Sequence, residues 1–307
     1  MHAYMLSRHE HNGLIWLDLE SPTREEVRAL AAEFDIKPLV AEELIVPSIK
    51  PRAEFYENYA FFVLHFPSTR HGMRAREQEI DFVVGHNFLI TARYDNIDPL
   101  HQFAKVFEAN SLLDENGVGD HAGFLLFYML KQLYKAVEHE VDHVRNDLVK
   151  IEDHIYNGNE VDMVFEISRT ARDLLNLRQS IEPHREALHT LENEGVKFFG
   201  ADFASYLRSI SNEYYRVHNH IMRETESLHE LRETNNSLLT TKQNETMKVF
   251  TIMAFVTFPL SLIVSVFNLN VADNPLHSMP NVFWVTVAVL AGLMIMMYGY
   301  FKHKKWL

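Results

Sequence analysis

Residues 249–271 of this chain have the sequence VFTIMAFVTFPLSLIVSVFNLNV, and residues 282–301 have the sequence VFWVTVAVLAGLMIMMYGYF. Neither stretch contains a lysine, arginine, aspartate or glutamate. Each has about the 20 residues that an α-helix needs to cross the hydrocarbon core of a bilayer. A buried helical hairpin of a soluble protein is the alternative, but two adjacent uncharged stretches of this length favour a pair of transmembrane helices.

The residues that flank the two stretches indicate their orientation. Lys248 directly precedes the first stretch, and the basic residues Lys302, Lys304 and Lys305 follow the second. Residues 272–281, which prolines and asparagines predict to be a short loop, contain no lysine or arginine. Because basic residues gather on the cytoplasmic side, both termini are predicted to be cytoplasmic, in a multi-pass protein of the plasma (inner) membrane.

Composition excludes several other classes of protein. The net charge of −13 leaves no electrostatic footprint for nucleic acid, so no nucleic-acid partner is expected. The absence of cysteine excludes disulfides and thiolate metal sites. The sequence contains no glycine-rich phosphate loop and no G-x-S-x-G elbow, so an enzyme is not expected, nor is a covalently bound cofactor.

Residues 1–112 are predicted to form a cytoplasmic domain of mixed strands and helices. Residues 14–19 and 60–66 favour strands, and residues 80–94 predict a hairpin that turns at Gly85-His86-Asn87. Ser21-Pro22 marks the start of a helix that is expected to end near residue 34.

Residues 113–246 are predicted to form a helical domain and stalk. Helical periodicity extends over about 120–156, 161–193 and 203–268, with a possible break at Pro183. Proline and glycine are absent between residues 201 and 258, which predicts one helix of roughly 65 residues that continues into the membrane. The fold class is therefore an α+β domain, a long helical stalk and, in residues 247–307, a transmembrane hairpin with a basic tail.

The first transmembrane stretch has a polar face. A two-helix hairpin encloses no pore, so conduction requires several copies around an axis. At 3.6 residues per turn, the following side chains share an arc of about 120°: Asn244, Thr251, Phe258, Ser261, Ser265 and Asn268. Small polar residues in membrane helices also serve close packing, which is the alternative interpretation.

Two histidines suggest a separate metal site. His139 and His143 are four residues apart among Glu138, Glu140 and Asp142, a spacing that places both imidazoles on one helix face. The alternative is that they are surface residues of an acidic helix.

Short motifs along nearly the whole chain resemble the CorA magnesium transporters. The similarity is carried by these stretches: Asn244-Glu245-Thr246-Met247-Lys248-Val249-Phe250-Thr251, Phe258-Pro259-Leu260, Asn268-Leu269-Asn270, Met279-Pro280 with Trp284, Trp16-Leu17-Asp18-Leu19, and Ile49-Lys50-Pro51-Arg52.

The resemblance implies a funnel-shaped homopentamer, surrounded by membrane lipids, that passes Mg²⁺ and possibly Co²⁺ or Ni²⁺ through a central channel. Divalent cations would be its substrate and possible regulator. By position, the pore-lining residues would be Asn244, Met247, Thr251, Phe258, Ser261 and Ser265. Phe258 would form a hydrophobic constriction, and Glu233 would attract cations at the inner mouth.

The sequence departs from the family at the outer mouth. The family motif Gly-Met-Asn is Asn268-Leu269-Asn270 here, and Asp273 is the only carboxylate left in the loop. Neutral amide oxygens suit a hydrated cation, because Mg²⁺ gives up its waters reluctantly. The departures leave two alternatives open, a Zn²⁺ transporter of the same superfamily, possibly proton-coupled, and a non-conducting metal sensor.

Overall fold

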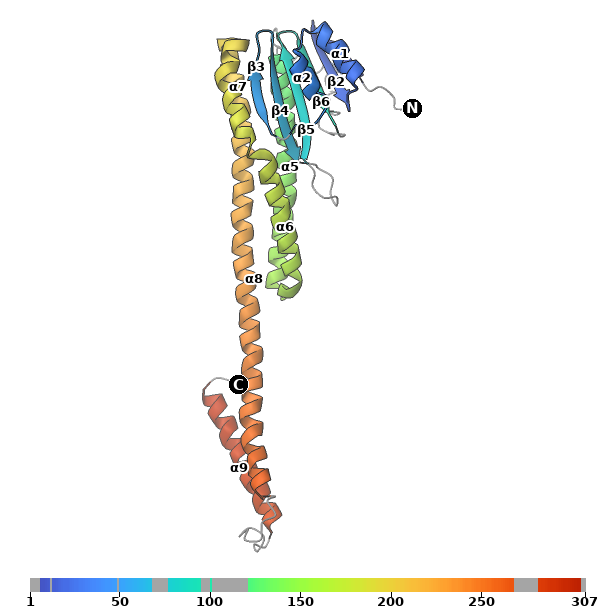
Figure 1. The fold of residues 1–307 in the computed structure, drawn as a ribbon. Helices are drawn as coiled ribbons and strands as arrows, with labels where there is room; N and C mark the ends of the chain where they lie inside the picture. The colour runs from blue at the N-terminus through green and yellow to red at the C-terminus, as the bar shows by residue number, and fades with distance from the viewer. Residues whose placement is uncertain are drawn as a thin grey trace. The chain divides into compact units, whose positions relative to one another are not determined.

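The computed structural model describes residues 6–11, 13–48, 50–67, 77–94, 100, 121–267 and 281–304. The chain divides into two compact units, Met1–Arg232 and Glu233–Leu307. Figure 1 shows the elements of both units.

The first unit contains a six-stranded mixed sheet with the strand order β1-β2-β6-β5-β4-β3. Its strands are β1 (Leu6–His11), β2 (Leu14–Glu20), β3 (Arg52–Phe55), β4 (Tyr59–Pro67), β5 (Glu77–Gly85) and β6 (Phe88–Arg93). β2 and β6 run parallel, and the other neighbouring pairs are antiparallel. The predicted hairpin of residues 80–94 is confirmed by β5 and β6, whereas β1 and β3 were not predicted.

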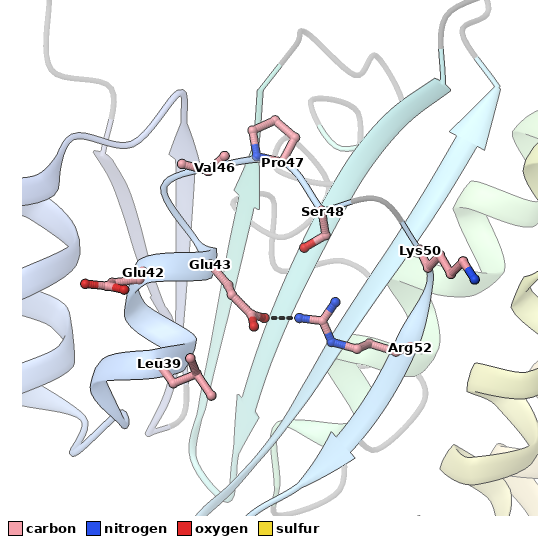
Figure 2. Close-up of a pocket in the computed structure, with 8 residues that line it drawn as sticks. All are labelled: Leu39, Glu42, Glu43, Val46, Pro47, Ser48, Lys50 and Arg52. Carbon is pink, nitrogen blue, oxygen red and sulfur yellow. Dashed lines mark hydrogen bonds and ion pairs between the residues drawn. The ribbon is translucent and has the colours of Figure 1, made fainter.

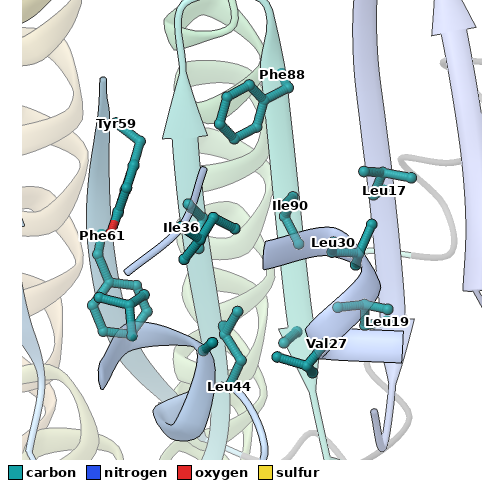
Figure 3. Close-up of a cluster of buried hydrophobic side chains, with 14 of the residues drawn as sticks. Leu17, Leu19, Val27, Leu30, Ile36, Leu44, Tyr59, Phe61, Phe88 and Ile90 are labelled. Atoms are coloured by element: carbon teal, nitrogen blue, oxygen red, sulfur yellow. The ribbon is translucent and has the colours of Figure 1, made fainter. Parts of the chain in front are cut away.

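Helices α1 (Arg24–Glu33) and α2 (Pro38–Glu43) cover one face of this sheet. Helix α1 begins at a capping box, because the Glu26 amide donates to Thr23 Oγ1 and the Thr23 amide donates to Glu26 Oε2. Figure 3 shows the apolar core between the helices and the sheet. Its labelled members are Leu17, Leu19, Val27, Leu30, Ile36, Leu44, Tyr59, Phe61, Phe88 and Ile90.

Helices α5 (Gly123–Tyr156), α6 (Glu160–Ile181) and α7 (His184–Phe199) contact the sheet through β3, β4 and β5. Alternate side chains of a strand point to opposite faces, so a sheet packed on both sides buries both sets. All nine residues of β4 are accordingly buried. Helix α7 begins directly after Pro183, so the predicted interruption at this proline is confirmed.

An aromatic cluster joins the starts of α5 and α8 (Ala204–Phe267) to the end of α7. The ring of His121 stacks on Phe199, and the ring of Phe203 stacks on Tyr206. Phe124 packs edge-on against both Phe203 and Tyr206. These contacts anchor the first turns of α8 in the first unit.

The second unit contains the remainder of α8 and helix α9 (Val282–His303). Helix α8 has 64 residues, as the absence of proline and glycine predicted. Two helical segments, Ala201–Val266 and Phe283–His303, are long and apolar enough to cross a membrane. The expected domain boundaries near residues 112 and 246 stay predictions. The boundary near residue 112 lies outside the described part of the chain, which omits residues 101–120. The boundary near residue 246 lies within α8, which is continuous there.

Candidate functional site

The second half of α8 exposes many large apolar side chains. Phe250 and Phe255 are each 61% exposed and Phe258 is 78% exposed. No part of the most apolar 18-residue window of α8 is buried. A helix with this much exposed apolar surface needs lipid or neighbouring helices around it, because contact of that surface with water is unfavourable.

The predicted pore-lining residues occupy one face of that helix. Because α8 is continuous from residue 204 to 267, its period of 3.6 residues places this face within an arc of about 100°. The members of the face are Glu233, Asn244, Met247, Thr251, Phe258, Ser261 and Ser265. From Glu233 to Ser265 the face extends about 48 Å at 1.5 Å per residue.

Thr251 uses its hydroxyl in a way that suits contact with water around a cation. Its Oγ1 donates to the Met247 carbonyl at 2.7 Å, one turn earlier on the same helix. The single hydroxyl proton is thereby occupied, and the lone pairs of Oγ1 stay available as acceptors. Thr246 makes the equivalent bond to the Lys242 carbonyl at 3.0 Å, on another side of α8.

Pro259 interrupts the backbone hydrogen bonds of α8 next to the exposed ring of Phe258. A proline has no amide proton, so the carbonyl of Phe255 loses its usual partner four residues later. The helix therefore has an apolar ring and a weakened turn at neighbouring positions, an arrangement that allows a local bend.

The outer-mouth candidates Asn268, Leu269, Asn270 and Asp273 lie outside the described residues. Asn281 is the next described residue and directly precedes the first turn of α9. Its φ of 66° lies in the left-handed region. The Val285 amide donates to the Asn281 carbonyl at 3.2 Å and closes that turn.

The histidine pair lies on the exposed side of α5. Both His139 and His143 are exposed, and the part of the chain that the structure describes contains no group of three His, Cys, Asp or Glu side chains placed to hold a metal ion. The pair therefore stays a two-ligand hypothesis.

The neighbouring acid Glu138 has another role, which sequence analysis did not identify. Arg216 on α8 donates to both carboxylate oxygens of Glu138 at 3.1 and 3.0 Å. The same guanidinium is 2.5 Å from Glu213. A bidentate pair of this kind fixes the orientation of two helices, and no local pattern reveals it because the partners are 78 residues apart.

Comparisons with known proteins identify a family and a fold. A family model described as "CorA-like Mg2+ transporter protein" matches residues 11–303. The "Cobalt/magnesium transport protein CorA" of Thermotoga maritima is 24% identical over 302 residues, which is 95% of this chain and 83% of that protein.

Two solved structures share the fold. The CorA magnesium transporter from Methanocaldococcus jannaschii superposes with a TM-score of 0.84 at 18% identity, covering 97% of this chain and 93% of that one. The full-length CmaX protein superposes with a TM-score of 0.73 at 17% identity, covering 95% of this chain and 89% of that one.

Proposed function

This chain belongs to the CorA-like Mg²⁺ transporter family, and from that premise we propose that it transports divalent cations across a membrane. The observation that carries the proposal is the face of α8 that continues from Glu233 in the polar stalk to Ser265, and that keeps hydroxyl side chains within the apolar stretch after residue 248. An anchor with no role in transport does not require such a face.

The proposed assembly is a homopentamer in which α8 of each copy lines a central pore. One α8 has a single polar face and encloses nothing, so the faces of several copies must meet around an axis. The apolar surfaces of α8 and α9 would then contact neighbouring copies and lipid, which accounts for their exposure in the single chain.

In this pore the cation would keep most of its water. Mg²⁺ dehydrates reluctantly, so rings of neutral oxygen atoms that accept hydrogen bonds from its waters are better suited than a cage of carboxylates. Asn244, Thr251, Ser261 and Ser265 supply such oxygen atoms. A ring of Phe258 side chains would stop water, and therefore ions, when the pore is narrow.

Transport would be passive, driven by the concentration gradient of the cation and by the membrane potential. A membrane potential contributes about 2.3 kcal/mol per elementary charge per 100 mV, or about 4.6 kcal/mol for a divalent cation. Glu233 would raise the local cation concentration at the cytoplasmic end of the face, and Asn268-Leu269-Asn270 would select the ion at the other end.

A Zn²⁺ transporter is the second candidate. The observation in its favour is the outer motif, where Asn268 replaces the family glycine and Asn281 replaces the usual acid. Proton coupling would distinguish this mechanism from a passive channel.

The test is metal flux into liposomes that contain the purified full-length protein. Mg²⁺, Co²⁺, Ni²⁺ and Zn²⁺ are compared with and without a pH gradient. Thr251→Val removes an acceptor from the polar face, and Thr246→Val is the matched control because Thr246 makes the same backbone bond on another side of α8.

We expect Mg²⁺ flux that Thr251→Val and Asn270→Ala reduce and Thr246→Val leaves unchanged. Zn²⁺ flux that increases with a proton gradient would replace the first candidate with the second. Equal loss in both threonine variants would contradict the assignment of the face. Folded, pentameric protein without flux of any ion would refute transport and favour a metal sensor.

A further inference from the structure

Two acidic side chains of β5 lie buried on the face of the sheet that α2 covers. Glu79 is 6% exposed and Asp81 is fully buried. They are two residues apart on one strand, so both side chains point to the same face as Val83, a member of the core under α1 and α2. Two buried acids on one strand are rare, because burial penalises the charged form.

The hydrogen bonds identify Glu79 as the ionised member of the pair. Its Oε1 accepts from the Ser48 amide at 2.7 Å, and its Oε2 lies 3.1 Å from Nε2 of His65. The same imidazole nitrogen lies 3.1 Å from the Ser48 carbonyl. One oxygen of Glu79 thus accepts from the Ser48 amide, and the other shares the Nε2 proton of His65 with the Ser48 carbonyl.

Asp81 has the opposite environment. Its Oδ2 lies 3.0 Å from the Tyr94 hydroxyl, which is also 3.1 Å from the Glu43 carbonyl. A hydroxyl proton that is shared between two acceptors forms two weak bonds, and a carbonyl only accepts. Both contacts are satisfied if Asp81 is a carboxylic acid that donates to the Tyr94 oxygen. Oδ1 of Asp81 has no hydrogen-bond partner within the described part of the chain, which also fits an uncharged acid.

Two of these hydrogen bonds, from Tyr94 to the Glu43 carbonyl and from the Ser48 amide to Glu79, attach the residues that follow α2 to the sheet. Glu43 is the last residue of α2 and Ser48 ends the stretch 44–48, so Tyr94 and Glu79 fix the two ends of this stretch to the sheet. Figure 2 shows that Glu43, Ser48 and Arg52 line a surface pocket of about 570 Å³ between α2 and β3, where Arg52 is ion-paired with Glu43.

We propose that Asp81 holds a proton that keeps residues 44–48 attached to the sheet, and that losing this proton releases them. When Asp81 ionises, Tyr94 donates its proton to the new carboxylate and leaves the Glu43 carbonyl. The second negative charge also lies beside Glu79, which binds the Ser48 amide. Both attachments are therefore weakened by one titration.

The charged and titratable groups around Asp81 determine the direction of the effect. They come from α2, β3, β4, β5 and the residue after β6: Glu43, Arg52, His65, Glu77, Glu79 and Tyr94. Burial, followed by the charge of Glu79, raises the pKa of Asp81 well above its usual range. The attached state therefore binds the proton more tightly than the released state, and attachment is lost as the pH rises through this pKa.

His65 also titrates, but it does not produce the same release. Its hydrogen bond to Glu79 raises the pKa of His65 against the opposing effect of burial. A neutral imidazole still has one N–H, so His65 keeps its bond to the Ser48 carbonyl after losing its proton.

The test is amide hydrogen exchange of the full-length protein in detergent, measured by mass spectrometry on peptides covering residues 44–48 over a pH series. Exchange times are corrected for the pH dependence of the chemical rate. Because one proton is released, protection in the wild type should fall by about tenfold for each unit of pH as the pH rises from the pKa of Asp81 in the released state to its pKa in the attached state. Asp81→Asn cannot ionise and keeps a donor for Tyr94, so this fall should disappear.

Glu42→Gln is the matched control, because Glu42 lies at the same pocket but points away from it in Figure 2. This variant should keep the full pH dependence. A second measurement needs no variant: the infrared carbonyl band of the protonated Asp81 carboxyl group should vanish around the pH at which the fall in protection levels off, which is the pKa of Asp81 in the attached state. Wild-type protection that is independent of pH, or an Asp81→Asn protein that keeps the whole fall, would overturn the proposal.

Discussion

Replacing His184 by glutamine should make the first unit more resistant to acid. His184 is fully buried at the start of α7, where its Nδ1 lies 2.9 Å from the Tyr134 hydroxyl and its Nε2 lies 2.8 Å from the His65 carbonyl. Nε2 must donate to that carbonyl, so Nδ1 accepts from Tyr134 and the ring is neutral. The side chain thus joins α7, α5 and β4 through one imidazole.

The magnitude follows from the shift in pKa. Burial lowers the pKa of His184 from 6.5 to about 3. Between these values the unfolded state binds a proton that the native state does not, so stability falls as the pH falls. Each pH unit below 6.5 costs about 1.4 kcal/mol, and from pH 7.5 to pH 5 the loss is about 2 kcal/mol.

The assay is the free energy of opening of the β4 amides, measured by hydrogen exchange on the full-length protein at pH 7.5 and pH 5. The difference between wild type and His184→Gln isolates this group, because all other titrations are common to both. His189→Gln is the control, since His189 lies exposed on the same helix. If the wild type and His184→Gln lose equal stability between the two pH values, the reasoning about the neutral buried ring is refuted.

Three further substitutions test the packing of the first unit, each by amide exchange or thermal unfolding of the full-length protein. Thr23→Ala should cost about 1 kcal/mol by removing the cap of α1, whereas Thr23→Ser should keep most of that stability. Leu44→Ala should cost about 2–5 kcal/mol because Leu44 is buried under the sheet, while Leu39→Ala, at an exposed position, should change stability by less than about 0.5 kcal/mol. Arg93→Met should cost about 3–5 kcal/mol by leaving Asp18, 3.2 Å from the guanidinium, buried without its partner, and a second change of Asp18→Leu should recover much of the loss. An Arg93→Met protein as stable as the wild type would show that this ion pair contributes nothing.

Local signals predicted the long helices closely. Helix α8 ends within one residue of the expected limits, because helix continuation depends on backbone groups and on the absence of proline and glycine. The break at Pro183 and the hairpin of β5 and β6 follow from equally local chemistry. The histidine pair and the pore face were likewise chosen on spacing, and both stay predictions.

Strands β1 and β3 were missed because they are edge strands. β1 has the sequence LSRHEH, which does not alternate apolar and polar residues, and β3 has the sequence RAEF, which alternates over only four residues. Their position depends on pairing with β2 and β4, which are more apolar. An edge strand needs little apolar surface of its own, and its sequence therefore contains little evidence of it.

The sequence by itself determined that two uncharged helices end this chain, that one of them extends a long charged stalk, and that one face of that helix is polar. These properties depend on the helix period and on the free energy of transferring side chains out of water, and both act on neighbouring residues. Only the tertiary structure decided that Asp81 and Glu79 are buried and that His184 is neutral. In the sequence of β5 these acids alternate with Ile80 and Phe82, as residues facing water would. They are buried because α2 and the stretch after it cover that face, and the pairing of distant segments decides which groups lose their water.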